Sequence, residues 1–321
     1  MKRFMKIVNF NILSVIIGFF LLSCDWNDDN SEMKLVFNRD NEIWLYDLKT
    51  EKLKKLVAVN EIVYTNEKGT IYSRQWAGGA KWSPNGKKIV FIESVATDAQ
   101  NMKLMNMETQ KQEFFPNYIY RQDGSVEWST DGKQLVFSKS IASLGLNYEL
   151  FIINADRTNE TQLTDRPFHT DVWPSLHPNG IEIIFISKLK NTSDYPQVYH
   201  TTVFGDTVNQ LTEAVRFTLP PKFNPKTGEI IYAIKNIDTK KTVIWKVSDI
   251  KFTDPVQLAA IDVPINDLTW SNDGELIVFV RFAGGTHGPY TNPEIWMMNG
   301  DGTNKKLIIK NGSGPSLWVN N

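Results

Sequence analysis

The sequence is poor in the residues that most often build reactive or cross-linked sites. Its 321 residues include one cysteine and four histidines, and the formal net charge is −1. One cysteine excludes an intramolecular disulfide, and the balanced charge lacks the basic surplus that nucleic-acid binding needs. The chain contains no H-E-x-x-H, G-x-S-x-G, C-x-x-C or Walker motif. We therefore expect no catalytic residues, no metal, no cofactor and no nucleic-acid partner.

The chain begins with a short basic and apolar segment. Lys2, Arg3 and Lys6 precede a largely apolar run of 11 residues at positions 12–22. This run is too short to cross a bilayer, which needs about 20 residues. A basic start followed by a short apolar run is typical of an export signal.

The residues around Cys24 resemble the lipobox of bacterial lipoproteins. Leu21 is the apolar residue three positions before the cysteine, and the small Ser23 directly precedes it. The resemblance implies that residues 1–23 are a signal peptide and that Cys24 carries a lipid; a buried free cysteine is the alternative. Residues 24–32 are polar and acidic, and we expect a flexible tether. The expected location is the bacterial cell envelope, with the lipid in the outer membrane and the facing side left open.

A pattern of about 47 residues recurs through the rest of the chain. Each copy has a large anchor residue, a tight turn with Asn-Gly, Asp-Gly or a close relative, and then a β-branched and aromatic strand. The anchors are Trp82, Trp128, Leu176, Phe223 and Trp270, at steps of 46, 48, 47 and 47 residues. A sixth anchor, Trp318, lies in the last strand of the chain, whereas the strand at residues 34–37 has no strand before it.

Repeats of this length predict a β-propeller. One small four-stranded sheet cannot bury both of its faces, so consecutive sheets stack and close a ring. Runs such as residues 89–92 and 276–280 are apolar throughout, as expected for strands packed between two blades. The predicted fold class is all-β: a six-bladed β-propeller of four-stranded antiparallel blades. The C-terminal strand is expected to complete blade 1 and so close the ring.

The repeat resembles that of TolB-type six-bladed propellers. The resemblance rests on the W-S-P-N-G turn at Trp82, the I-V-F strand after it, the E-I-W strand at residues 294–296 and the hairpin at 299–304. It covers residues 33–321 and implies the propeller fold. TolB has a separate α/β domain before its propeller, whereas about nine residues separate Cys24 from the first strand here. The family's Pal-binding role is therefore not carried over.

The long connections between strands are expected on one face of the ring, opposite the Asn-Gly turns. Loops on a rigid scaffold often bind ligands, and aromatic residues and arginine dominate binding hot spots. We expect Asp123 and Asp171, which precede inner strands at matching positions, to lie at the channel mouth. The candidate ligand-binding residues are Arg74, Trp76, Tyr120, Arg121, Asp123, His169, Asp171, Trp173, Arg216, Arg281, His287 and Tyr290. The alternative for each is a structural role in covering the ring.

The leading hypothesis is a non-catalytic, monomeric propeller that binds a protein, peptide or glycan through its long-loop face. A polysaccharide lyase or glycoside-processing enzyme is the alternative, with Tyr120, Arg121, His169 and His287 near the axis. A third possibility is a scaffold that assembles through its outer strands near residues 52–55. His177 occupies a turn position of the repeat and is expected to be structural.

Overall fold

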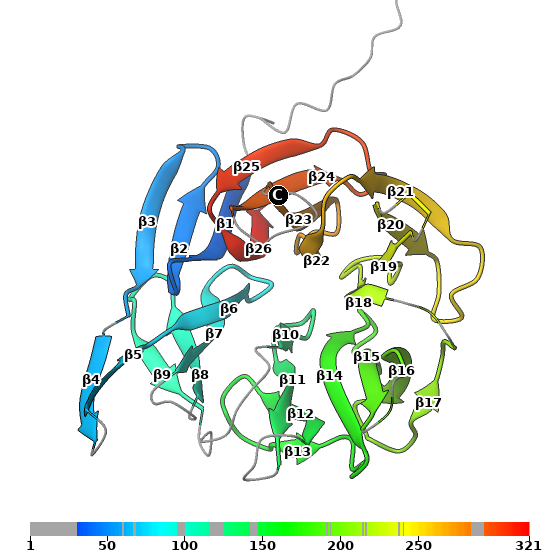
Figure 1. Cartoon of the computed structure of the whole chain (residues 1–321), viewed down its shortest axis with the longest axis horizontal. Coiled ribbons are helices and arrows are strands. Elements are labelled where there is room, and N and C mark those ends of the chain that lie inside the picture. Colours follow the sequence, from blue (N-terminus) through cyan, green and yellow to red (C-terminus); the bar gives the residue numbers. More distant parts are fainter. Residues whose placement is uncertain are drawn as a thin grey trace, which may run out of the picture.

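The computed structural model describes residues 31–59, 61–66, 69–94, 100–115, 125–141, 147–190, 192, 194–213, 215, 217–236, 238–239, 241–283 and 292–320. These residues form β-strands and turns, and no helix among them is long and apolar enough to cross a membrane. Figure 1 shows the strands as a ring of small sheets around a central axis. The predicted all-β class is confirmed.

Six four-stranded antiparallel sheets form the blades. From the axis outwards, blade 1 contains β26 (Ser313–Asn320), β1 (Glu32–Arg39), β2 (Glu42–Asp47) and β3 (Lys52–Val57). Blade 2 contains β6 (Ala77–Trp82), β7 (Lys88–Ser94), β8 (Gln100–Asn106) and β9 (Gln112–Phe114). Blade 3 contains β10 (Val126–Trp128), β11 (Gln134–Ser140), β12 (Tyr148–Asn154) and β13 (Thr161–Gln162). Blade 4 contains β14 (His169–Leu176), β15 (Glu182–Leu189), β16 (Gln197–Thr202) and β17 (Asn209–Gln210). Blade 5 contains β18 (Phe217–Phe223), β19 (Ile230–Lys235), β20 (Thr242–Val247) and β21 (Val256–Ile261). Blade 6 contains β22 (Ile265–Trp270), β23 (Leu276–Phe282), β24 (Pro293–Asn299) and β25 (Lys306–Lys310).

Blade 1 combines strands from the two ends of the described chain. β26 pairs antiparallel with β1, from Glu32 opposite Asn320 to Asn38 opposite Ser313. β26 lies innermost in the strand order β26-β1-β2-β3. The predicted sixth anchor, Trp318, is off by one residue, because Leu317 pairs with Leu35 at the register of the other anchors and Trp318 packs toward blade 2. The predicted closure of the ring by the C-terminal strand is confirmed.

The hydrophobic core is divided among the interfaces between neighbouring blades. Each of six clusters of buried side chains draws mainly on two adjacent blades. The second strands contribute the largest fully buried side chains, Phe37, Phe91, Phe137, Phe185 and Phe279. Because a second strand lies between two blades, both of its faces are apolar, which accounts for the unbroken apolar runs of the repeat.

Each anchor is followed by a turn that polar side chains hold. In blade 2, the Ser83 hydroxyl accepts a hydrogen bond from the Lys88 N–H at 2.9 Å and donates one to Asn85 Oδ1 at 2.9 Å. Gly86 has a φ of 67°, in the left-handed region that glycine enters at little cost. In blade 4, His177 Nδ1 accepts from the N–H two residues further on, at 3.1 Å. His177 therefore occupies the serine position of the turn and holds it through a different backbone N–H.

The two ends of the ring differ. We call the end with the anchor turns the turn face, and the opposite end, with the connections between blades, the loop face. β1 runs from the turn face to the loop face, and β26 runs back beside it. Ser31 accordingly lines a hollow on the turn face together with Asp273 and Asp301. A separate hairpin of β4 (Glu61–Asn66) and β5 (Gly69–Arg74) follows blade 1 in the chain.

Candidate functional site: the central channel and its mouth

The first strands of the six blades line a central channel with two rings of residues. The linings of two cavities place the positions one and three before the anchors of blades 2 to 6 on the side toward the axis. The inner ring is Lys81, Glu127, Ser175, Lys222 and Thr269, one position before the anchors, together with Ser316 in blade 1. In blade 1 the register of the anchors belongs to Leu317, which lies opposite Leu35 and packs between blades 6 and 1. The mouth ring, two positions further from the anchors, is Gly79, Ser125, Trp173, Pro220, Asp267 and Gly314.

The two rings border two cavities. The mouth ring lines a cavity of about 340 Å³ on the loop side. A second cavity of about 180 Å³ on the turn side is lined by most of the inner ring and by anchors and turn residues. Lys81, Lys222 and Thr269 line both cavities, so the inner ring marks the level at which the two sides of the channel meet.

Trp173 brings a large aromatic surface to the mouth. Its φ is 54°, a conformation that bulky residues rarely adopt and that is concentrated at functional sites. β14 is irregular between Val172 and Ser175, and such irregularities re-aim a side chain. The Trp173 N–H donates to Ser125 Oγ of blade 3 at 3.2 Å. The side chain nevertheless stays 40% exposed.

Asp267 adds a carboxylate to the same cavity. Its Oδ2 accepts a hydrogen bond from the Gly314 N–H at 3.1 Å, which links blade 6 to blade 1. The mouth therefore combines an exposed indole, an acidic group and the rings of Pro220 and Pro315. These groups can contact a peptide or a glycan with its apolar surface, its donors or a cationic group.

The inner ring contains one closely bonded charge pair. The Lys222 ammonium forms an ion pair with Glu127 Oε2 and also donates to the Pro174 carbonyl at 2.9 Å. Glu127 Oε1 accepts from the Ser175 hydroxyl at 2.9 Å. Ser175 Oγ in turn accepts from the Phe223 N–H at 3.0 Å. Both oxygens of Glu127 are thus occupied, and three neighbouring blades are linked.

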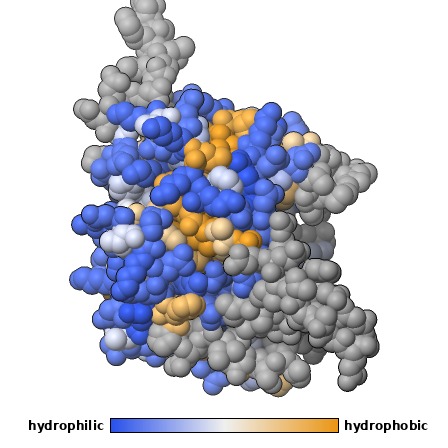
Figure 2. Space-filling view, turned by 90° about the vertical axis from the view of Figure 1, so that its left-hand side faces the viewer, coloured by the Kyte–Doolittle hydropathy of each residue, from blue (hydrophilic) through white to orange (hydrophobic). Residues whose placement is uncertain are grey.

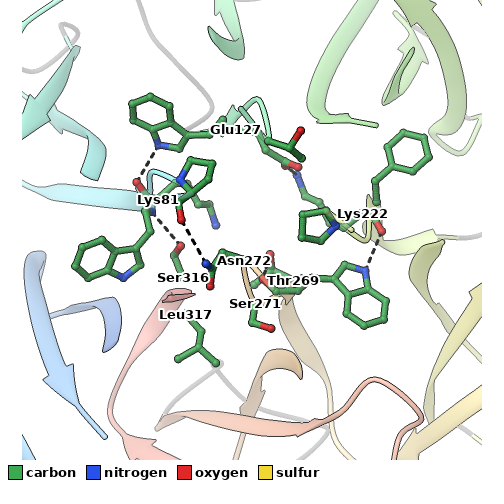
Figure 3. A pocket seen from close by; sticks show the side chains of 15 residues that line it. Lys81, Glu127, Lys222, Thr269, Ser271, Asn272, Ser316 and Leu317 are labelled. Carbon is green, nitrogen blue, oxygen red and sulfur yellow. Dashed lines mark hydrogen bonds and ion pairs between the residues drawn. The ribbon is translucent and has the colours of Figure 1, made fainter. Parts of the chain in front are cut away.

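Lys81 faces the channel without such a partner. Its Nζ lies 3.5 Å from the Pro315 carbonyl oxygen, at the limit of hydrogen bonding. No carboxylate of the described residues lies within 4.0 Å of it. Burial, followed by the charge of Lys222, lowers the pKa of Lys81, while the charges of Asp267 and Glu127 act in the opposite direction. Figure 3 shows Lys81 on the opposite side of the cavity from Lys222.

The anchor tryptophans fix these lysines in place. Trp128 Nε1 donates to the Lys81 carbonyl at 3.2 Å, and Trp270 Nε1 donates to the Lys222 carbonyl at 3.3 Å. Each bond joins the anchor of one blade to the first strand of the preceding blade (Figure 3). The lysine positions are therefore set by the rigid part of the fold.

The structure describes the side chains of five predicted site residues: Trp76, His169, Asp171, Trp173 and Arg281. Of these, only Trp173 lines the loop-side cavity of the channel. Arg74 lies in β5, where the backbone is described. The other candidates lie outside the described residues: Cys24, Tyr120, Arg121, Asp123, Arg216, His287 and Tyr290.

Asp171 belongs to a buried network and not to the channel mouth. It is fully buried, accepts from the Ser187 hydroxyl at 2.5 Å and pairs with Arg166 at 3.3 Å. Burial raises the pKa of Asp171, against the effects of Ser187 and Arg166. The expected position at the mouth is therefore wrong. Asp171 lies five positions before its anchor, beyond the mouth ring, where its side chain reaches Ser187 on β15 and Arg166 in the connection from blade 3.

His169 is part of the same network. Arg166 Nη2 lies 2.8 Å from His169 Nδ1, and the imidazole lies edge-on to Tyr199 with 6.2 Å between ring centroids. Burial and then the charge of Arg166 lower the pKa of His169. These contacts hold the ring away from both channel cavities. Within the described part of the chain, no group of three or more His, Cys, Asp or Glu side chains converges on a possible metal position.

Trp76 and Arg281 lie elsewhere on the loop face. Trp76 borders a separate hollow of about 390 Å³ that shares no lining residue with the channel cavities. Arg281 pairs with Glu294 at 2.9 Å and stacks over Trp296 at 4.2 Å. The structure thus does not bring Trp76, Trp173 and Arg281 into one site.

The sequence interpretation missed the inner ring and one buried carboxylate, Glu149. Glu149 is fully buried; its oxygens accept from the Thr164 hydroxyl at 2.6 Å and the Arg166 N–H at 2.9 Å. Burial raises its pKa. Gln197 holds the same position in blade 4 and accepts from the Thr212 hydroxyl at 3.0 Å. The repeated geometry assigns Glu149 a structural role.

Comparison with known proteins identifies the family. The profile of the TolB beta propeller domain (PD40) matches residues 65–316, and the chain belongs to this family. No curated protein matches the sequence.

Solved structures show the same fold. TolB from Acinetobacter baumannii has 17% identity and a TM-score of 0.65, and the match covers 89% of this chain and 66% of that chain. A structure described as TolB from Agrobacterium tumefaciens has 13% identity and a TM-score of 0.65, with 90% and 97% covered. An oligogalacturonate lyase in complex with manganese has 13% identity and a TM-score of 0.53, with 83% and 73% covered. At these identities the likeness concerns the fold alone.

Proposed function

We propose that this protein is an envelope-anchored lipoprotein whose propeller binds a partner at the channel mouth on the loop face, without catalysing a reaction. The observation that carries the proposal is Trp173. A bulky residue with a φ of 54° and 40% exposure costs stability twice, through backbone strain and through apolar surface left in water. Such a cost is typical of residues retained for binding.

The position of the N-terminal strand supports the assignment of faces. β1 begins at the turn face, where Ser31 lines a surface hollow, so the proposed tether at residues 24–32 joins the ring on that side. A lipid on Cys24 directs the turn face toward the membrane. The loop face then points away from the membrane, where a protein, peptide or glycan can reach it.

Replacement of Trp173 tests the proposal. The full-length lipidated protein and Trp173→Ala are cross-linked mildly in the native envelope, isolated, and compared for what each retains. Phe204→Ala is the matched control, because Phe204 is 73% exposed but lies on the β16–β17 hairpin at the turn face. A partner lost from Trp173→Ala and kept by Phe204→Ala is the expected result. Equal recovery of every partner by both variants, with intact melting curves, contradicts binding at the mouth.

A polysaccharide-processing enzyme is the second candidate. The observation that favours it is the likeness in fold to an oligogalacturonate lyase. Of the four residues that the sequence associates with this function, the structure describes His169, whose imidazole contacts Arg166 and Ser187. Turnover of a polyuronate that depends on Trp173 or Lys81 would favour this candidate over simple binding.

A further inference from the structure

The inner ring of the channel carries an excess positive charge. Lys81 and Lys222 contribute two ammonium groups, and Glu127 contributes one carboxylate. The ion pair neutralises Lys222 and Glu127, and the remaining oxygen of Glu127 is bonded to the Ser175 hydroxyl. One cation, that of Lys81, remains uncompensated at this level of the channel.

The Lys81 ammonium retains donors that no described group uses. Its single hydrogen-bond partner is the Pro315 carbonyl at 3.5 Å, although an ammonium has three N–H donors. Its side chain is part-buried, and an uncompensated charge that is shielded from water is costly. A part-buried charged group with free donors that borders a cavity is the usual arrangement of a site for a group of opposite charge.

Two hydroxyl groups border the same cavity. Ser316 Oγ accepts a hydrogen bond from the Trp82 N–H at 3.1 Å, which leaves its own proton to donate. The Thr269 hydroxyl has only a long bond of 3.4 Å, to the neighbouring Trp270 carbonyl. With Lys81 they provide three donors around the turn-side cavity (Figure 3). Trp82 and Trp270 also line the cavity and add apolar walls.

We propose that the channel binds a carboxylate group at Lys81, with Ser316 and Thr269 as further donors. The cavity of about 180 Å³ accommodates a carboxylate and a few atoms of the molecule that carries it. One uncompensated positive charge matches a monoanion, so a carboxylate is preferred to the phosphate dianion. This site lies deeper in the channel than the mouth, and it does not depend on the partner proposed for Trp173.

The charges around Lys81 give the site a defined pH dependence. The groups that act on it are Lys222 on β18, Asp267 on β22 and Glu127 on β10. Because burial and Lys222 lower the pKa of Lys81, the empty channel favours loss of its proton, and a bound carboxylate favours its retention. Binding is therefore tight below the pKa of Lys81 and weakens as the pH rises through it.

The test measures carboxylate binding by the full-length protein, from NMR chemical shifts at constant ionic strength. Acetate is the basic probe, and inorganic phosphate is the competing anion. Triglycine with a free or an amidated C-terminus represents a peptide source, and galacturonate represents a glycan source. We expect acetate to bind more tightly at pH 6 than at pH 10. At about pH 8, where phosphate is mainly the dianion, we expect acetate to bind more tightly than phosphate. The peptide and glycan probes show which source is preferred.

Lys81→Met should weaken acetate binding at least tenfold. Lys226→Met is the matched control, because Lys226 is an exposed lysine on the turn face that pairs with Glu275. The acetate affinity of this variant should stay within twofold of the wild-type value. Unchanged affinity in a cooperatively melting Lys81→Met protein overturns the proposal. Should that variant fail to fold, the wild-type protein still decides: acetate affinity that is equal at pH 6 and pH 10 overturns the proposal as well.

Discussion

Replacing Lys81 with methionine should stabilise the ligand-free protein. Methionine keeps the length and flexibility of the lysine stem and removes the ammonium. The group removed has one hydrogen bond, at 3.5 Å. An uncompensated buried polar group costs about 1–3 kcal/mol, and the lower part of this range applies because Lys81 is part-buried. The lost attraction to Asp267 and Glu127, neither of which contacts the ammonium, subtracts part of this gain. We expect a net gain of about 1 kcal/mol, which raises the Tm by roughly 2 °C for a chain of this size.

The effect should depend on pH in a direction that the pKa of Lys81 determines. The pKa is lowered from its ordinary value of 10.5, so between the lowered value and 10.5 the unfolded state binds more protons than the folded state. Wild-type stability therefore rises with pH across this window. The advantage of Lys81→Met is full below the window and shrinks within it, so it should be larger at pH 6 than at pH 9.5.

The assay is chemical denaturation at pH 6 and pH 9.5, with the slope of the transition used to check that unfolding remains two-state. At neither pH should Lys226→Met change the free energy of unfolding by more than about 0.5 kcal/mol, as for other exposed substitutions. A Lys81→Met protein that is less stable than wild type at pH 6 would refute the reasoning. That result would mean that the Lys81 charge is compensated in the folded protein.

Three further predictions concern the ring and its network. Gly86→Ala should cost more stability than Gly180→Ala: both positions have positive φ, but an added Cβ lies 2.2 Å from Trp318 at Gly86 and meets nothing within 4 Å at Gly180. Strain alone costs about 1–2 kcal/mol, so equal midpoints in urea would contradict the Trp318 contact. Deleting residues 315–321 should abolish cooperative melting, because it removes four buried side chains of β26 and exposes the edge of β1. A wild-type calorimetric transition would contradict ring closure. Glu149→Gln should raise the free energy of unfolding by about 1 kcal/mol at pH 7 and by less at pH 4. The pKa of the Glu149 carboxyl is raised in the folded state, so wild-type stability falls as the pH rises through that pKa. A gain that is larger at pH 4 than at pH 7 would contradict this direction.

The fold was predictable because its determinants are local and repeated. An anchor, a glycine turn and an apolar second strand recur at nearly constant spacing, and each copy has the same physical explanation in the structure. The closure of blade 1 followed from the same counting, since Trp318 is one repeat beyond Trp270. Long connections carry no such repeat. Their residue types indicate binding but do not say where each side chain points.

The channel lining was visible in the sequence but was not recognised. Lys81, Glu127 and Lys222 directly precede their anchors, as a K-W, an E-W and a K-F pair. Alternation on a strand turns a residue next to a buried anchor to the other face, which in a first strand is the axis. Asp171 could not be placed in this way, because the irregularity of β14 between Val172 and Ser175 depends on tertiary contacts.

The six blades provide an internal comparison that separates structural groups from functional ones. Glu149 is buried and Lys81 is part-buried, both have shifted pKa values, and a shifted pKa alone would favour a functional role for each. Glu149 has an equivalent in Gln197, which makes the matching bonds in blade 4, so its position serves the fold. Lys81 has its equivalent in Lys222, but Lys222 is paired with Glu127 and Lys81 is not. The departure from the repeat, not the burial itself, therefore identifies Lys81 as the group retained for a ligand.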